Sequence, residues 1–125
     1  MFFVHDHRGI IAIHGEDRKS FLQGLITNDI QKGPCLYTAM LSPQGKFQHD
    51  FFVFGVRDTL YLTPEKDRLP ALLQRLTMYK LRSDVTLTDV TNQWTLVSDK
   101  DESLEIRYLD PRHPDLGHIG LAAVD

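Results

Sequence analysis

A histidine and an aspartate stand side by side in front of a strongly apolar segment of this chain. His49 and Asp50 come directly before the run FFVF at residues 51–54. Successive residues of a β-strand point to opposite faces of a sheet, so one of these two side chains faces the covered side and the other the open side. An aspartate is disfavoured in a strand and costly to bury, so Asp50 at this place needs a specific role.

Two roles for Asp50 are open from the residue types alone. If its carboxylate points into a cleft, it can accept hydrogen bonds from a ring-shaped ligand that is rich in N–H groups. The alternative is structural, in which the side chain caps a turn or pairs with a nearby cation such as Lys46 or Arg57. The residue types do not distinguish the ligand-binding role from the ion-pair role.

Other catalytic chemistry has little support in the sequence. The chain has no G-x-S-x-G, no G-x-G-x-x-G and no P-loop, so nucleophile-elbow, dinucleotide-binding and Walker sites are not indicated. Cys35 is the single cysteine and cannot form an internal disulfide or a cysteine-based metal site. His5 and His7 have strand spacing, but two imidazoles without further ligands do not make a metal site. We therefore assign no catalytic residue and no metal ligand.

The strands that must position Asp50 follow from hydrophobic patterning and turn residues. A Pro-Gln-Gly turn at residues 42–45 predicts an antiparallel hairpin, and a tight turn at residues 58–59 extends it to a three-stranded meander. The complete set of expected strands covers residues 9–14, 35–41, 46–56, 60–62, 85–90, 94–98 and 104–109. The segment after these strands is rich in turn-forming residues and ends in small apolar ones.

Two helices are expected from apolar residues spaced three and four apart. The first runs from Gly15 to about Ile30. The second has Thr63 as an N-cap before Pro64, but Pro70 is costly inside a helix, so it either kinks the helix or moves the true start to near Leu69. The order of elements predicts a single α+β domain over residues 1–125. Its antiparallel or mixed sheet carries two helices on one face and a ferredoxin-like element.

Composition excludes several protein classes. The chain has 125 residues, 42% of them hydrophobic, and a net charge of −3 from 14 basic and 17 acidic residues. That apolar content supports a real core and argues against disorder. A mildly acidic chain with scattered cations predicts no nucleic-acid binding, and no apolar run is long enough for a membrane span. The first residues do not resemble a signal peptide, so we expect a cytoplasmic protein.

Three segments together resemble a known family. They are residues 21–30 (FLQGLITNDI), the hairpin at residues 41–54 (LSPQGKFQHDFFVF) and residues 79–85 (YKLRSDV). In combination they are similar to the amino-terminal part of the folate-binding T-protein, or aminomethyltransferase, superfamily. The closer resemblance is to its YgfZ branch, whose members bind folate and assist the assembly or maintenance of iron–sulfur clusters.

The resemblance implies a three-part protein around a central tetrahydrofolate pocket, of which this chain is the amino-terminal portion. The family's pocket carboxylate falls on Asp50, and the cofactor-binding residues implied are Asp50, His49, Leu41 and Thr63. Aminomethyltransferases usually carry paired acids where this chain has His49-Asp50, and an Asn where it has Thr63-Pro64. Both departures favour the branch without transferase activity. The branch's K-G-C-Y-x-G-Q-E motif is absent, so no thiol role passes to Cys35.

The resemblance thus leaves three functions open. The first is a tetrahydrofolate-binding accessory protein for iron–sulfur proteins, with a pocket that this portion leaves incomplete and with weak or no folate binding by the portion alone. The second is a folate-dependent aminomethyltransferase, and the third is an interaction module without a ligand. The expected partners are reduced folate and iron–sulfur client or assembly proteins. The surface left by the missing part should be an apolar patch or a homodimer contact.

Overall fold

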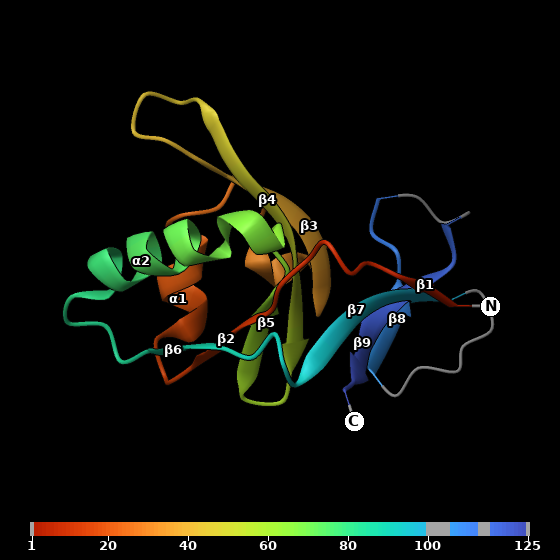
Figure 1. Cartoon of the computed structure of the whole chain (residues 1–125). Helices are drawn as coiled ribbons and strands as arrows, with labels where there is room; N and C mark the ends of the chain where they lie inside the picture. The colour runs from red at the N-terminus through yellow and green to blue at the C-terminus, as the bar shows by residue number, and fades with distance from the viewer. Residues whose placement is uncertain (1, 100–105, 113–115, 125) are drawn as a thin grey trace.

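In the part of the chain that the structure describes, residues 2–99, 106–112 and 116–124, the computed structural model contains two antiparallel β-sheets and two α-helices (Figure 1). Among these residues the first sheet has the strand order β3-β4-β5-β2-β6, with bounds Cys35–Leu41, Phe47–Val56, Thr59–Leu62, Ile11–His14 and Thr86–Asp89. The second sheet, as far as it is described, has the order β1-β7-β9-β8, with bounds Phe2–Val4, Trp94–Asp99, His118–Ala123 and Ile106–Leu109.

Strands β3, β4 and β5 form the predicted antiparallel meander. The turn between β3 and β4 is closed by the amide of Ser42, which donates to the carbonyl of Lys46 over 2.7 Å. Gly45 has a φ of 81°, a conformation that glycine adopts without steric cost. A register irregularity between Met40 and Leu41 interrupts the β3–β4 ladder just before this turn. The hairpin projects beyond the helices in Figure 1.

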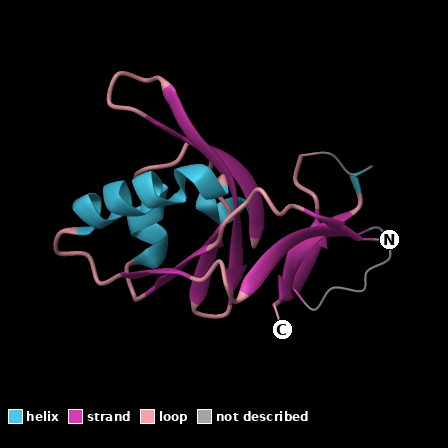
Figure 2. Ribbon diagram, in the orientation of Figure 1, coloured by secondary structure: helices cyan, strands magenta, loops and turns pink. Residues whose placement is uncertain are grey.

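Both α-helices lie against the same face of the first sheet (Figure 2). Their bounds are Arg18–Gln23 for α1 and Leu69–Lys80 for α2, and the short 3₁₀ turns η1 and η2 cover Ile30–Lys32 and Lys66–Arg68. Leu22 of α1 and Leu72 and Leu76 of α2 are fully buried and share one apolar core with Phe51 and Val53 of β4. The α+β architecture with two helices on one face is therefore confirmed.

The opposite face of the first sheet packs against the second sheet. Phe52 and Phe54 of β4 share an apolar core with Leu96 of β7 and with Ile119 and Leu121 of β9. Because residues alternate along a strand, the run FFVF supplies side chains to both faces of the sheet. Strand β4 is thus buried on both sides, which explains its continuous apolar sequence.

The second helix begins at the later of the two expected starts. Helix α2 begins at Leu69, with Pro70 in its first turn, and η2 precedes it. The first turn is where proline is tolerated, because the amides there have no partner inside the helix.

The first helix is much shorter than the prediction of residues 15–30. Helix α1 ends at Gln23, and the chain then runs alongside the outer edge of β3. There the Thr27 amide donates to the carbonyl of Ala39 over 2.9 Å, and Ile26 forms a bridge with Met40. The apolar spacing of this segment therefore reflects burial against the core and not a continuing helix.

Two strands and the division into two sheets were not predicted. Strand β1 has only three residues, too few to show alternation, and it pairs with β7. Strand β9 contains Gly120 and small residues of low strand propensity, and it lies between β7 and β8. The expected strand at residues 104–109 is found as β8 from Ile106 onward, and residues 104 and 105 lie outside the described residues.

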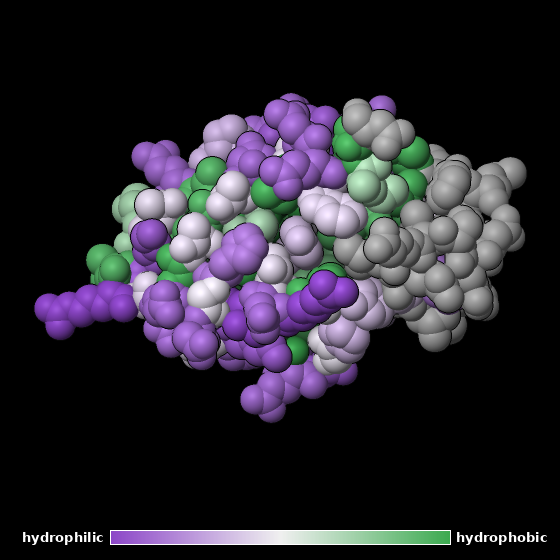
Figure 3. Space-filling view, turned by 90° about the horizontal axis from the view of Figure 1, so that it is seen from below, coloured by the Kyte–Doolittle hydropathy of each residue, from purple (hydrophilic) through white to green (hydrophobic). Residues whose placement is uncertain are grey.

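Exposed apolar side chains gather at the hairpin tip and at the end of α2. Phe47 is 63% exposed, Met78 66% and Leu81 85%. In Figure 3, hydrophilic side chains cover most of the helical end, and hydrophobic ones show between them in small patches. Within residues 2–99, 106–112 and 116–124, no helix has the length and apolar character needed to span a bilayer.

Candidate functional site

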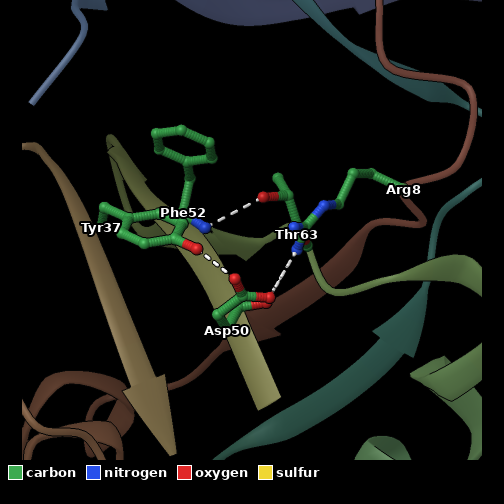
Figure 4. Close-up of polar contacts among 5 residues, drawn as sticks. All are labelled: Arg8, Tyr37, Asp50, Phe52 and Thr63. Atoms are coloured by element: carbon green, nitrogen blue, oxygen red, sulfur yellow. Dashed lines mark hydrogen bonds and ion pairs between the residues drawn. The ribbon is translucent and has the colours of Figure 1, made fainter. Parts of the chain in front are cut away.

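The carboxylate of Asp50 lies at the centre of a polar cluster on the face of the first sheet that meets the second sheet (Figure 4). The Tyr37 hydroxyl donates to Asp50 Oδ2 from the neighbouring strand β3. Arg8 Nη1 lies 3.2 Å from Asp50 Oδ1. The Asp50 side chain is 25% exposed and that of Arg8 12% exposed, so the ion pair is largely sheltered from water.

Arg8 connects three parts of the chain at this cluster. The same Nη1 nitrogen donates to the backbone carbonyl of Asp50 over 2.8 Å and to the carbonyl of Thr63 over 3.1 Å. Arg8 therefore ties the segment before β2 to strand β4 and to the segment after β5. The ion pair suggested by the sequence exists, but the expectation of Lys46 or Arg57 as the partner is wrong, because Arg8 takes this place.

Thr63 is fully buried and its side chain is committed to the backbone. Its hydroxyl accepts a hydrogen bond from the Phe52 amide over 3.0 Å, and its own amide donates to the Phe52 carbonyl over 3.1 Å. These bonds extend the pairing of β4 with β5 by one residue. The carbonyl of Thr63 is then held where Arg8 reaches it.

The electrostatics of the cluster favour an ionised Asp50. Burial raises the pKa of Asp50, but the hydrogen bond from Tyr37 and the charge of Arg8 lower it by more, so the net pKa lies below its ordinary value. Burial and the hydrogen bond to Asp50 raise the pKa of Tyr37, which keeps its hydroxyl protonated as a donor. Each carboxylate oxygen has two lone pairs, so Asp50 can still accept hydrogen bonds from a ligand.

A second guanidinium lies beside this cluster. Arg112 lies over the Phe52 ring, 4.9 Å from its centroid, and Phe52 in turn packs against Tyr37 with ring centroids 5.0 Å apart. Arg112 is held by the buried carboxylate of Asp110, with 2.7 Å between Nη2 and Oδ2. The site thus combines an anionic acceptor, two cations and the half-buried ring of Tyr37, which suits a flat polar ring, whereas Phe52 is only 3% exposed.

His49 and Leu41 lie apart from this cluster. His49 faces the helices and is 5% exposed, and its Nδ1 has no hydrogen-bond partner among the described residues. Burial, together with the charges of Arg68 and Arg75, lowers the pKa of His49, so its ring is neutral at pH 7. Leu41 is 38% exposed, and its carbonyl accepts from Arg75 over 2.8 Å.

Asp50 and His49 both line a hollow of about 40 Å³, together with Glu65 and Arg68. That volume holds about one water molecule. Ligand pockets measure roughly 300–1,000 Å³. The described residues therefore enclose no ligand-sized pocket at Asp50.

Cys35 has no features of a reactive thiol. Burial and the charge of Asp110 raise the pKa of its thiol to about 12. Among the described residues, no three His, Cys, Asp or Glu side chains are close enough together to hold a metal ion.

Four groups at the site were not identified from the sequence. Arg8, and Arg112 with its partner Asp110, reach the site only through the tertiary fold, and no local pattern marks them. Tyr37 shares a face with Asp50 because the irregularity between Met40 and Leu41 shifts the ladder by one residue. The turn alone would have placed Tyr37 on the opposite face.

The fold of this chain resembles that of an aminomethyltransferase. The structure matches the glycine cleavage system aminomethyltransferase T of Bartonella henselae with a TM-score of 0.67 and 16% sequence identity, over 78% of this chain and 27% of that protein. At this identity the match establishes the fold. In addition, residues 3–98 match the profile of the GCVT N-terminal domain, and the chain belongs to this family.

Curated relatives of two kinds are similar to this chain. The iron–sulfur cluster assembly factor IBA57 homolog, mitochondrial, of Mycosarcoma maydis is 28% identical over 92% of this chain, and that of Cryptococcus neoformans is 35% identical over 70%. The aminomethyltransferase of Bacillus velezensis is 36% identical over 48% of the chain. The chain spans 34% of the Mycosarcoma relative and 24% of the Cryptococcus one.

Proposed function

We propose that this chain is the folate-contacting amino-terminal part of an accessory protein for iron–sulfur cluster assembly or maintenance. The similarity to relatives named as iron–sulfur cluster assembly factors supports a role in this process, because the similarity extends over 92% of the chain. The similarity to an aminomethyltransferase covers 48%. The expected partners are accordingly iron–sulfur client or assembly proteins.

The observation that carries the ligand proposal is the ionised, partly exposed carboxylate of Asp50. When bound, tetrahydrofolate supplies a pterin ring with N–H groups and nitrogens that can carry a one-carbon unit. Asp50 would accept hydrogen bonds from such N–H groups, because Tyr37 and Arg8 keep it charged at neutral pH and leave lone pairs free. The half-buried ring of Tyr37 suits the flat ring beside it, while Phe52 is buried and supports Tyr37 from below.

The other expected contacts have different roles in this proposal. Thr63 acts through Arg8 and Phe52 and holds the cluster in place, since its side chain is fully buried. Leu41 is 38% exposed on the hairpin, where the remainder of a longer protein would cover it. His49 is already buried on the helix-facing side of β4, so in this proposal it acts on the site only through the strand that it shares with Asp50. A pocket of which this chain forms one wall loses most of its buried contact area when the other walls are missing, so we expect weak folate binding by the chain alone.

Two alternatives make different predictions. An aminomethyltransferase would transfer a methylene group to tetrahydrofolate when supplied with the partner proteins of the glycine cleavage system. An interaction module without a ligand would show no response to reduced folate, and the satisfied ion pair between Arg8 and Asp50 is the observation that favours it.

A titration with tetrahydrofolate followed by NMR separates these readings. We expect saturable shifts of backbone amides at Asp50 and Phe52 and no methylene transfer. No shift at these amides in the folded chain would favour the module, and methylene transfer above background would favour the enzyme.

We also propose a cytoplasmic location. The fungal relatives carry the word mitochondrial in their names, so fractionation of host cells is the test of the compartment.

We further propose self-association through the surface left by the missing part of a longer protein, to which we assign the exposed Leu41 and Phe47 of the hairpin tip. Sedimentation of the wild type and of Phe47→Ser tests the contact: a concentration-dependent dimer that the substitution abolishes supports it, and a monomer at all concentrations excludes it.

A further inference from the structure

A larger cavity lies at the end of β4 farthest from the Asp50 cluster. Its volume is about 390 Å³, within the range of small-molecule sites. Val53 and Leu60 line it and are 2% exposed, so part of its wall is continuous with the apolar core under the helices. Val53 faces the helices and Asp50 faces the second sheet, so this cavity is separate from the proposed folate contact.

The polar residues that line this cavity are cationic or neutral. Lys19 of α1 and Arg57 of the β4–β5 turn contribute the charges, and Gln31 of η1 contributes an amide. Among the described residues, neither Lys19 nor Arg57 forms an ion pair, and no acidic side chain lines the cavity. The nearby Asp58 lies 4.0 Å from Arg18. This local excess of positive charge contrasts with the net charge of −3 of the chain.

The backbone at Arg57 gives independent support for a role of its side chain. Arg57 has a φ of 56°, in the left-handed region where glycine or asparagine is usual in a tight hairpin turn. A long cationic side chain at such a place carries a steric cost, and positions of this kind cluster at functional sites. Glycine would form this turn with less strain, so the turn geometry itself does not explain the arginine.

We propose that this cavity binds a small organic anion. A carboxylate or phosphate group would lie between Lys19 and Arg57, and an apolar body would contact Val53 and Leu60. Two unpaired cations at the rim of an apolar cavity complement a molecule that is charged at one end and hydrophobic at the other.

The test uses phenyl phosphate, benzoate and inorganic phosphate as probes in NMR titrations of the 125-residue chain. Saturable shifts are expected at Gly33 and Gly55, which line the cavity, and not at Asp50. Both organic anions should bind at least about fivefold more tightly than inorganic phosphate. Equal affinities, or shifts centred on Asp50, would overturn the proposal.

Two variants and a matched control separate binding from folding. Lys19→Gln and Arg57→Gly should each lower the affinity for the organic anions about fivefold. A loss of this size corresponds to one partly screened ion pair. Arg57→Gly should leave the melting temperature unchanged or higher, because it relieves the positive φ. Lys46→Gln removes a similar charge at the β3–β4 turn, outside the cavity, and should leave affinity unchanged. Equal weakening in all three variants, or in none, would contradict an anion site here.

Discussion

The substitution Asp50→Asn tests whether the cluster at Asp50 depends on a carboxylate charge. The asparagine keeps the shape of the side chain and an oxygen for Arg8, but it removes the charge that strengthens the bonds from Tyr37 and Arg8. Hydrogen bonds to a charged group contribute about 1.5–3 kcal/mol each. Because the side chain is 25% exposed and one bond is retained, we expect a loss of about 1.5 kcal/mol at pH 7.

This loss corresponds to a measurable shift in melting temperature. Unfolding entropy near 60 °C is about 2.1 cal/mol/K per residue, or about 0.26 kcal/mol/K for a chain of 125 residues. A change of about 1.5 kcal/mol then lowers the melting temperature by about 6 °C. Urea unfolding followed by the fluorescence of Trp94, the single tryptophan, gives the free energy at each pH.

The pH dependence gives the sharper test. The pKa of Asp50 is lower in the folded chain than in the unfolded chain, so the ionised carboxylate stabilises the fold above the unfolded value of about 3.9. This contribution is lost as the pH falls below about 4 and through the depressed folded pKa. The stability difference between wild type and Asp50→Asn should therefore be full at pH 7 and shrink toward pH 3.

The control for this experiment is Asp58→Asn, at the other end of β4. The Asp58 side chain is fully exposed, so its substitution should leave stability unchanged at every pH. If Asp50→Asn behaved like Asp58→Asn, or if its effect were the same at pH 7 and pH 3, the argument for a charge-dependent cluster would be refuted.

Three further predictions concern other single positions of the chain. Thr63→Val should cost about 1–3 kcal/mol more than Thr63→Ser in urea unfolding, because only valine leaves the buried Phe52 amide without its acceptor; equal costs would contradict this. Gly15→Ala should destabilise the chain by more than about 1 kcal/mol, because Gly15 has a φ of 118° and the added Cβ would lie 2.1 Å from the carbonyl oxygen of Asp84. A melting temperature equal to that of the wild type would exclude that clash. The Cys35 thiol, with a pKa of about 12, should react with iodoacetamide at pH 8 at least about tenfold more slowly than glutathione, and a comparable rate would show an accessible thiolate.

Local chemistry made part of this structure predictable. Strand β3 was predicted with its observed bounds, and the start of α2 near Leu69 followed from the position of Pro70. Helix α1 was overextended because the residues after Gln23 bury apolar side chains while their backbone pairs with β3. The spacing of apolar residues in that segment would be the same whether it continued as a helix or packed against the core alongside β3.

The candidate site was predictable only in its central residue. Asp50 was identified because a carboxylate before an apolar run needs a partner or a ligand. Its partner Arg8 lies 42 residues earlier, and such a contact depends on the packing of the whole domain. Tyr37 faces Asp50 through a one-residue irregularity in the β3–β4 ladder that no turn residue signals.

The most direct measurement of the central claim is the affinity of the chain for tetrahydrofolate with and without the Asp50 carboxylate. NMR titration under oxygen-free conditions reads the Asp50 and Phe52 amides even when binding is weak. We predict saturable shifts in the wild type and in Asp58→Asn, and about tenfold weaker binding in Asp50→Asn, as expected for the loss of one charge-assisted hydrogen bond. The same affinity in all three proteins, or shifts that never involve these amides, would contradict a folate contact at Asp50.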